Sequence, residues 1–295
     1  MILVTGATGS IGTHLVRLLL DRGVPFRALV RDPAKGQALG CDYVVGSFDD
    51  PGSLATAMKG VDRLFLNTAG AQPVADGEQP MIRQQRAAID AARVAGVTRV
   101  VKVSVWHAHR GGRLAEGAHW EIEQYLKASG LGWTILQPSG FMQNFVTGAG
   151  TFTAEGGLVG AYGDAGVSYV DCQDIAACAA TLLTGTAGLG ETYVLTGPQS
   201  LTHADVAREI STVLGRSVAH VELSPDELAA SLRAQGLPAG FADDLAELCR
   251  EVATGSLAAT TTTVRELTGR EPRTFARFLA DNTAALRAGL LAATR

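Results

Sequence analysis

The N-terminal stretch of the chain decides its fold, and it reads Ile2-Leu3-Val4-Thr5-Gly6-Ala7-Thr8-Gly9-Ser10-Ile11-Gly12. A short apolar run leads into a turn with three glycines, and the residues that follow carry apolar side chains at helical spacing. A strand, a glycine-rich turn and a helix in succession place backbone N–H groups and the positive helix end around a pyrophosphate. The stretch therefore predicts a dinucleotide-binding turn from Gly6 to Gly12 at the start of an α/β fold.

The same rhythm of helix, glycine and short apolar run continues through the first half of the chain. The glycines that end the helical stretches and precede the apolar runs are Gly23, Gly40, Gly60, Gly96 and Gly130. This alternation predicts a parallel sheet with crossover helices, that is, a Rossmann-type, doubly wound α/β fold. We expect the NAD(P)-binding core to span residues 1–140.

After residue 140 the strict alternation fades, which predicts a smaller, mainly helical substrate-binding region over residues 141–295, packed as one unit with the core. Its first part, residues 148–166, is rich in glycine and is expected to be a loop, followed by a returning strand at about 167–170. The Thr260–Thr263 run is interpreted as the start of a strand or a helix. The predicted helices lie at roughly 174–184, 202–214, 225–235, 241–253 and 274–288.

Composition excludes several classes of function. The net charge of −4 is spread evenly and offers no basic stripe for nucleic acid, and the chain lacks the apolar run of about 18 residues that a membrane span needs. The cysteines have no metal-site spacing, so no metal site is predicted and free thiols are expected; they are Cys41, Cys172, Cys178 and Cys249. No leader peptide is recognised. We expect a cytoplasmic monomer or homodimer that acts on a small molecule.

The end of the second predicted strand bears on the choice between NAD and NADP. An acidic side chain at this place holds the ribose hydroxyls of NAD, whereas a cation favours the 2′-phosphate of NADP. The strand ends in Val30-Arg31-Asp32, with Lys35 close behind. Arg31 can grip the phosphate by a bidentate contact, which favours NADP(H); with Asp32 on the ribose instead, NAD(H) is possible.

Across nearly its whole length the chain resembles the NmrA-like, atypical branch of the short-chain dehydrogenase/reductase superfamily. Within that family the resemblance is to quinone oxidoreductase-like, azoreductase-like and triphenylmethane-reductase-like members. The order and spacing of several short motifs carry it, namely residues 4–9, 30–33, 46–54, 130–138, 141–144, 170–176 and 267–272.

The resemblance implies a set of cofactor contacts. The pyrophosphate is lined by Gly6, Thr8, Gly9, Ser10 and Ile11, and the 2′-phosphate meets Arg31. The adenine is flanked by Ser47 and Phe48, and the ribose and nicotinamide are approached by Asn67, Thr68, Ala69 and Ser104. Two positions depart from the family pattern: Ser47 replaces a common aspartate, and Gln137, before Pro138, replaces a usual arginine.

A catalytic centre is harder to find in the sequence. Typical members of the superfamily use a tyrosine and a lysine four residues later on one helix face, but here Tyr125 and Lys127 are two apart. His119 and Glu123 are four apart and share a face, which predicts either a hydrogen-bonded pair that holds a tautomer or donates a proton, or a surface pair. Ser104 ends a predicted strand, where it can hydrogen-bond a ligand or cap the following loop.

Three further groups have both a functional and a structural interpretation. A polar loop can form a lid or a solvent-exposed turn; it holds His107, His109, Arg110 and Arg113. A second group can form the wall of a site for a flat substrate, or core packing; it comprises Pro138, Phe141, Met142, Asn144 and Phe145. Asp171 and Asp174 are expected to cap the helix that begins near Ile175.

Three hypotheses for the function follow. The first is an NADPH-dependent reductase whose substrate, a quinone-like or conjugated aromatic or carbonyl compound, accepts hydride without a strong protein acid. The second is a regulatory protein that senses NAD(P) without turnover. The third is a polyketide-type tailoring ketoreductase, in which water or His119 supplies the proton.

Overall fold

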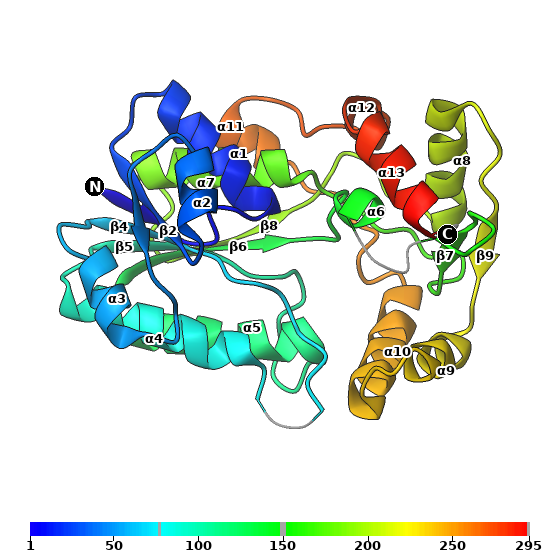
Figure 1. Ribbon diagram of the computed structural model, residues 1–295, viewed down its shortest axis with the longest axis horizontal. Helices are drawn as coiled ribbons and strands as arrows, with labels where there is room; N and C mark the ends of the chain where they lie inside the picture. Colours follow the sequence, from blue (N-terminus) through cyan, green and yellow to red (C-terminus); the bar gives the residue numbers. More distant parts are fainter. Residues whose placement is uncertain (76–77, 148–151, 294–295) are drawn as a thin grey trace.

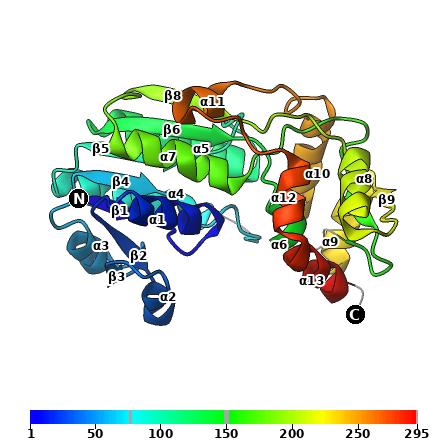
Figure 2. The ribbon, with the colours of Figure 1, turned by 90° about the horizontal axis from the view of Figure 1, so that it is seen from above.

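A seven-stranded parallel sheet forms the centre of the protein in the computed structural model, which describes residues 1–75, 78–147 and 152–293. The strand order is β3-β2-β1-β4-β5-β6-β8, so the direction of winding reverses between β1 and β4 (Figure 2). This is the doubly wound order and confirms the predicted fold class. The strands are β1 (Ile2–Val4), β2 (Phe26–Val30), β3 (Tyr43–Val45), β4 (Arg63–Leu66), β5 (Arg99–Val103), β6 (Gly132–Pro138) and β8 (Glu191–Leu195).

Helices cover both faces of this sheet, and Figure 1 shows one layer above the strands and one below them. One face carries α1 (Ser10–Asp21), α7 (Cys172–Thr184) and α11 (Thr263–Thr268), and the other carries α3 (Pro51–Ala57), α4 (Pro80–Val94) and α5 (Leu114–Ala128). The short helix α2 (Pro33–Ala38) packs at the β2–β3 edge. Strand β5 is buried along its whole length, as expected for a parallel sheet that is covered on both sides.

The C-terminal region lies beyond the carboxyl ends of the strands and has its own hydrophobic core (Figure 1). Phe145 stands at its centre, with the rings of Tyr169 and Phe275 packed edge-on against it at 4.9 and 5.3 Å. The strands of the region form a two-stranded parallel sheet, β7 (Leu158–Gly160) with β9 (His220–Glu222). Its helices are α6 (Asn144–Thr147), α8 (His203–Leu214), α9 (Pro225–Ala234), α10 (Ala239–Ala253), α12 (Phe275–Asp281) and α13 (Thr283–Ala293).

Several predicted elements of this half are corrected. Residues 167–170 form no strand: Val167 bridges Leu201 antiparallel and Val170 bridges Phe141 parallel, and two isolated bridges of opposite direction cannot continue as one ladder. The helix predicted over 274–288 is two helices, divided at Asn282.

The sheet also takes a seventh strand from the second half of the chain, because β8 pairs with β6. The division at residue 140 stays a prediction. Of the predicted loop 148–166, residues 148–151 lie outside the described part of the chain and β7 lies within the rest. The run Thr260–Thr263 leads into α11, in agreement with one of its two interpretations.

The prediction that Asp171 and Asp174 cap a helix is confirmed for Asp171 and wrong for Asp174, which lies within the first turn of α7. Asp171 is the N-cap of α7 and accepts a hydrogen bond from the Gln173 amide at 2.9 Å. Both carboxylates also hold Arg273, Asp171 through the guanidinium Nε at 2.7 Å and Asp174 through the backbone amide at 2.8 Å. These contacts fasten the segment before α12 to the start of α7. No helix within the described ranges has the length and apolar character to cross a membrane.

Candidate cofactor and active site

The glycine turn folds back on itself so closely that side chains are excluded. Gly6 has φ +62°, and a Cβ atom there would lie 2.9 Å from the Asn67 carbonyl oxygen. A Cβ atom on Gly12 would lie only 2.1 Å from the Gly6 carbonyl oxygen, which is backbone and cannot rotate away. The spacing of the glycines therefore follows from the contact between the turn, the first helical turn of α1 and the end of β4.

The start of α1 is suited to an anion. Its N-cap is Gly9, which provides no capping side chain, and no acidic residue stands in the first turn. Thr8, Gly9 and Ser10 are exposed. The first amide groups of the helix are thus free of side-chain acceptors and lie at the reversal point between β1 and β4, which fits the pyrophosphate that the sequence predicts.

Two side chains that the sequence analysis did not single out position the loop after β4. The Thr5 hydroxyl accepts a hydrogen bond from the Asn67 amide at 2.9 Å and lies 2.9 Å from the Phe65 carbonyl oxygen. Gln85, fully buried on α4, donates to the Thr68 hydroxyl at 2.9 Å. A glutamine on the apolar face of a helix was the available signal for the second contact.

The predicted contacts at the adenosine end are partly engaged within the protein. Asp32 caps α2, accepting from the Ala34 amide at 2.8 Å, whereas Arg31 and Lys35 are exposed. The Ser47 hydroxyl accepts from the Asp49 amide at 3.2 Å, and Phe48 is half-buried against the core. One oxygen of the carboxylate that would hold the ribose of NAD is thus engaged by the helix cap, and the nearby cations are accessible.

The candidate catalytic residues belong to two adjoining groups of polar contacts, here together called the β5–α5 cluster: Lys102 with His119, and Ser104 and Gln137 with Glu123. Four of the five side chains are buried, and Gln137 is half-buried. The Ser104 hydroxyl donates to Glu123 Oε1 at 2.5 Å, and Gln137 Nε2 donates to the same oxygen at 2.9 Å. Lys102 Nζ lies 2.8 Å from His119 Nδ1 and donates to the Val103 carbonyl oxygen at 3.0 Å. The sequence analysis had treated Lys102 only as a member of an apolar run.

The expectation of a hydrogen-bonded pair between His119 and Glu123 is wrong, because each has other partners. The surface alternative is also wrong, since the two side chains are buried. Burial lowers the pKa of Lys102 to about 7 and holds the pKa of His119 well below its usual 6.5. His119 is therefore a neutral imidazole near pH 7.

Tyr125 and Lys127 lie apart, as their spacing predicts. The Tyr125 hydroxyl donates to Asp90, with 2.8 and 2.9 Å to the two carboxylate oxygens, and this contact raises its pKa. Lys127 Nζ lies 5.2 Å from the centre of the Trp133 ring and 3.6 Å from Glu123 Oε2. The two side chains do not form the tyrosine–lysine unit of typical members.

The other sequence-predicted groups lie where the core meets the C-terminal region. His107 Nε2 lies 2.9 Å from the Ser256 carbonyl oxygen, and Arg113 pairs with Asp244 of α10 at 3.1 Å. The polar loop after β5 thus bridges to α10. Among the predicted substrate-wall residues, Pro138, Met142 and Phe145 are buried, Phe141 is half-buried and Asn144 is exposed. Their contact with a substrate stays a prediction.

Comparison with known proteins shows which family the chain is similar to. The NmrA-like family matches residues 1–279. An NAD(P)H azoreductase of Xenophilus azovorans is 36% identical over 290 residues, covering 97% of this chain and 99% of its own. A (4-alkanoyl-5-oxo-2,5-dihydrofuran-3-yl)methyl phosphate reductase of Streptomyces griseus is 34% identical, covering 97% and 99%. The crystal structure of an NADPH-dependent quinone oxidoreductase of Escherichia coli in complex with NADPH has a TM-score of 0.81 at 31% identity, covering 96% of this chain and all of that one.

Proposed function

The chain belongs to the NmrA-like family, and we propose that it is an NADPH-dependent reductase of quinone-like or conjugated carbonyl compounds. One observation carries the choice of substrate: the candidate proton donors are buried, and each is engaged in a contact within the β5–α5 cluster. Ser104, His119 and Glu123 expose 1, 6 and 2% of their surface, respectively. A substrate that accepts hydride without a protein acid suits such a site best, and a quinone or an enone is of that class.

The dinucleotide site fits the cofactor in shape and charge. The uncapped start of α1 and the excluded Cβ positions at Gly6 and Gly12 form a cradle for a pyrophosphate. Bound NADPH supplies the hydride, and the chain supplies binding and orientation. The relatives support this, since one is named for NAD(P)H and one was crystallised with NADPH.

The preference for NADPH rests on Arg31. Because Asp32 is engaged as a helix cap, we infer that the exposed Arg31 guanidinium meets the 2′-phosphate, with Lys35 as a second cation. A charge-assisted contact of this kind contributes about 1.5–3 kcal/mol, which corresponds to roughly 10–100-fold in affinity.

The first experiment follows the absorbance of reduced nicotinamide with menadione as acceptor, using NADPH and NADH in turn. We expect oxidation that prefers NADPH. In Arg31→Ser, KM for NADPH should rise about 10–100-fold with little change for NADH, whereas the matched control Arg216→Ser, in the exposed turn after α8, should match wild type. Tight binding of both cofactors without oxidation of any quinone, dye or enone would contradict the proposal and favour the sensing protein.

The ketoreductase alternative makes a different prediction at His119. If His119 delivered the proton, His119→Ala would abolish turnover while sparing NADPH binding. Because this imidazole is buried, neutral and in contact with Lys102, we expect menadione reduction to survive within a few-fold once NADPH binding shows that the variant is folded. Cytosolic location and a monomeric or homodimeric state stay predictions.

A further inference from the structure

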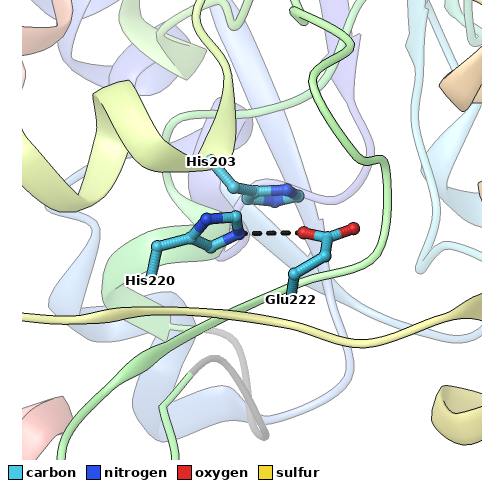
Figure 3. Close-up of side chains that lie close together, drawn as sticks. All are labelled: His203, His220 and Glu222. Atoms are coloured by element: carbon cyan, nitrogen blue, oxygen red, sulfur yellow. Dashed lines mark ion pairs between the residues drawn. The ribbon is translucent and has the colours of Figure 1, made fainter.

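A second cluster of titratable side chains lies in the C-terminal region, away from the cofactor cradle. It comprises His203, the first residue of α8, with His220 and Glu222 on β9 (Figure 3), and is here called the His203 cluster. One nitrogen or oxygen from each residue lies within 4.8 Å of the other two. The sequence analysis predicted no metal site from the spacing of the cysteines and did not consider these three residues, two of which are far from the third in the chain.

Two buried imidazole nitrogens of this cluster make no hydrogen bond within the described residues. His203 is 8% exposed, and its Nδ1 is buried and carries no hydrogen bond. His220 Nε2 is also buried; it lies 2.9 Å from Glu222 Oε2 but without the alignment of a hydrogen bond. Buried imidazole nitrogens are costly to leave unbonded, so the arrangement favours a bound partner.

The surroundings hold these groups in place. A Cβ atom on Gly160 would lie 2.6 Å from His220 Nε2 and 2.8 Å from His203 Nδ1, so only glycine lets both rings approach this strand. The Tyr162 ring packs on the His203 imidazole, with 4.7 Å between the ring centres, and the Gly163 amide donates to Glu222 Oε1 at 2.7 Å. A backbone donor on the second carboxylate oxygen is the outer-shell support that ligating carboxylates use.

We propose that the His203 cluster binds a divalent transition-metal ion, with zinc as the best match. Two imidazoles and one carboxylate are a ligand set that zinc takes with a fourth position open to water. Zinc bonds of about 2.0–2.2 Å place the ligand atoms about 3.5 Å from one another. The three ligand atoms lie within 4.8 Å of one another, and His220 Nε2 and Glu222 Oε2 are 2.9 Å apart, so modest side-chain rotations would bring them to that spacing.

The surroundings also give access to the cluster. A cavity of about 610 Å³ is lined in part by His203, Gly160 and Tyr162, so an ion can approach His203 from it. Because the ligands come from α8 and β9, a bound ion would fasten the helix to the small sheet.

The test is titration of the full-length protein, stripped with EDTA, with zinc chloride by calorimetry. We expect one high-affinity equivalent. Loss of a ligand should cost at least as much as loss of an outer-shell partner, so His220→Ala and Glu222→Gln should each weaken binding by about 100-fold or more. The matched controls are His109→Ala, in the exposed loop after β5, and Glu155→Gln, in an exposed turn, and both should bind as wild type.

A cobalt(II) spectrum separates this site from adventitious binding by the thiols. Cobalt on two imidazoles and a carboxylate gives weak visible bands without the intense near-ultraviolet absorption of thiolate ligation. The proposal would be overturned if zinc bound only weakly and in large excess, if both ligand variants kept the wild-type affinity, or if the cobalt spectrum showed thiolate ligation. NADPH binding by every variant checks that the chain is folded, and it does not depend on the metal.

Discussion

The β5–α5 cluster and the His203 cluster both gather titratable side chains beside an apolar core, but their hydrogen bonds are balanced differently. In the first, serine and glutamine donors meet the Glu123 carboxylate, and an ammonium group meets a neutral imidazole. In the second, two imidazoles and a carboxylate gather, and His203 Nδ1 and His220 Nε2 are buried without a hydrogen bond among the described residues. A saturated network holds a structure in place, whereas an acceptor-rich one indicates a ligand.

The largest expected effect concerns Lys102. Its ammonium loses its proton at about pH 7 in the folded chain and near 10.5 in the unfolded one, so the unfolded chain binds more protons between these values. The free energy of unfolding should therefore rise with pH over this window, by up to about 5 kcal/mol. Urea unfolding of Lys102→Met should lack this contribution, and an equal pH dependence in both proteins would contradict a buried ammonium.

His203 tests the other cluster in an acidic pH window, where the free energy of unfolding should again rise with pH. Its folded pKa of about 4 lies below the ordinary 6.5, so its contribution is complete above pH 6.5 and is lost as pH falls toward 4, by about 3 kcal/mol. In EDTA, His203→Leu should lose less stability than wild type on acidification. The raised pKa of Asp174 acts in the opposite sense in both proteins and cancels in the comparison. Parallel curves would show that this imidazole does not titrate on unfolding.

A substitution of Glu123 tests whether the β5–α5 cluster has a structural role or a catalytic one. Glu123→Gln weakens the acceptor for Ser104 and Gln137 and removes the ion pair with Lys127, so we expect a loss of about 1–3 kcal/mol in urea unfolding. Because the group is buried, turnover of folded protein with menadione should change less than stability. A selective loss of turnover with a shifted pH–rate profile would instead assign Glu123 to proton transfer.

Removal of a helix cap at the surface should give the smallest change in the free energy of unfolding, and it serves as a reference for the substitutions in the buried clusters. Asp32→Ala removes the acceptor for the Ala34 amide at the start of α2 and should cost about 1 kcal/mol. Since we assign the 2′-phosphate to Arg31, affinity for NADPH should stay near wild type. If NADH affinity fell sharply while NADPH affinity did not, Asp32 would hold the ribose after all.

Much of the core could be predicted from the sequence because its signals are local. The glycine turn, the helix ends and the alternation of strand and helix depend on backbone conformation and on burial of nearby apolar side chains. The second half of the chain could be predicted less well, because its pairings are not local. Strand β8 joins β6 across more than fifty residues, and the isolated bridges of Val167 and Val170 depend on partners at Leu201 and Phe141.

The candidate sites divide in the same way into features that local sequence determines and features that depend on tertiary structure. The sequence by itself determined the fold class, the anion cradle at Gly6–Gly12 and the absence of a tyrosine–lysine pair, because each depends on residues a few positions apart. Only the tertiary structure decided that His119 meets Lys102, that Glu123 meets Ser104, and that His203 faces Glu222. Side-chain partners are set by the register of strands and helices that are distant in the chain, and a residue's type alone does not show whether its charge is buried, paired or left for a ligand.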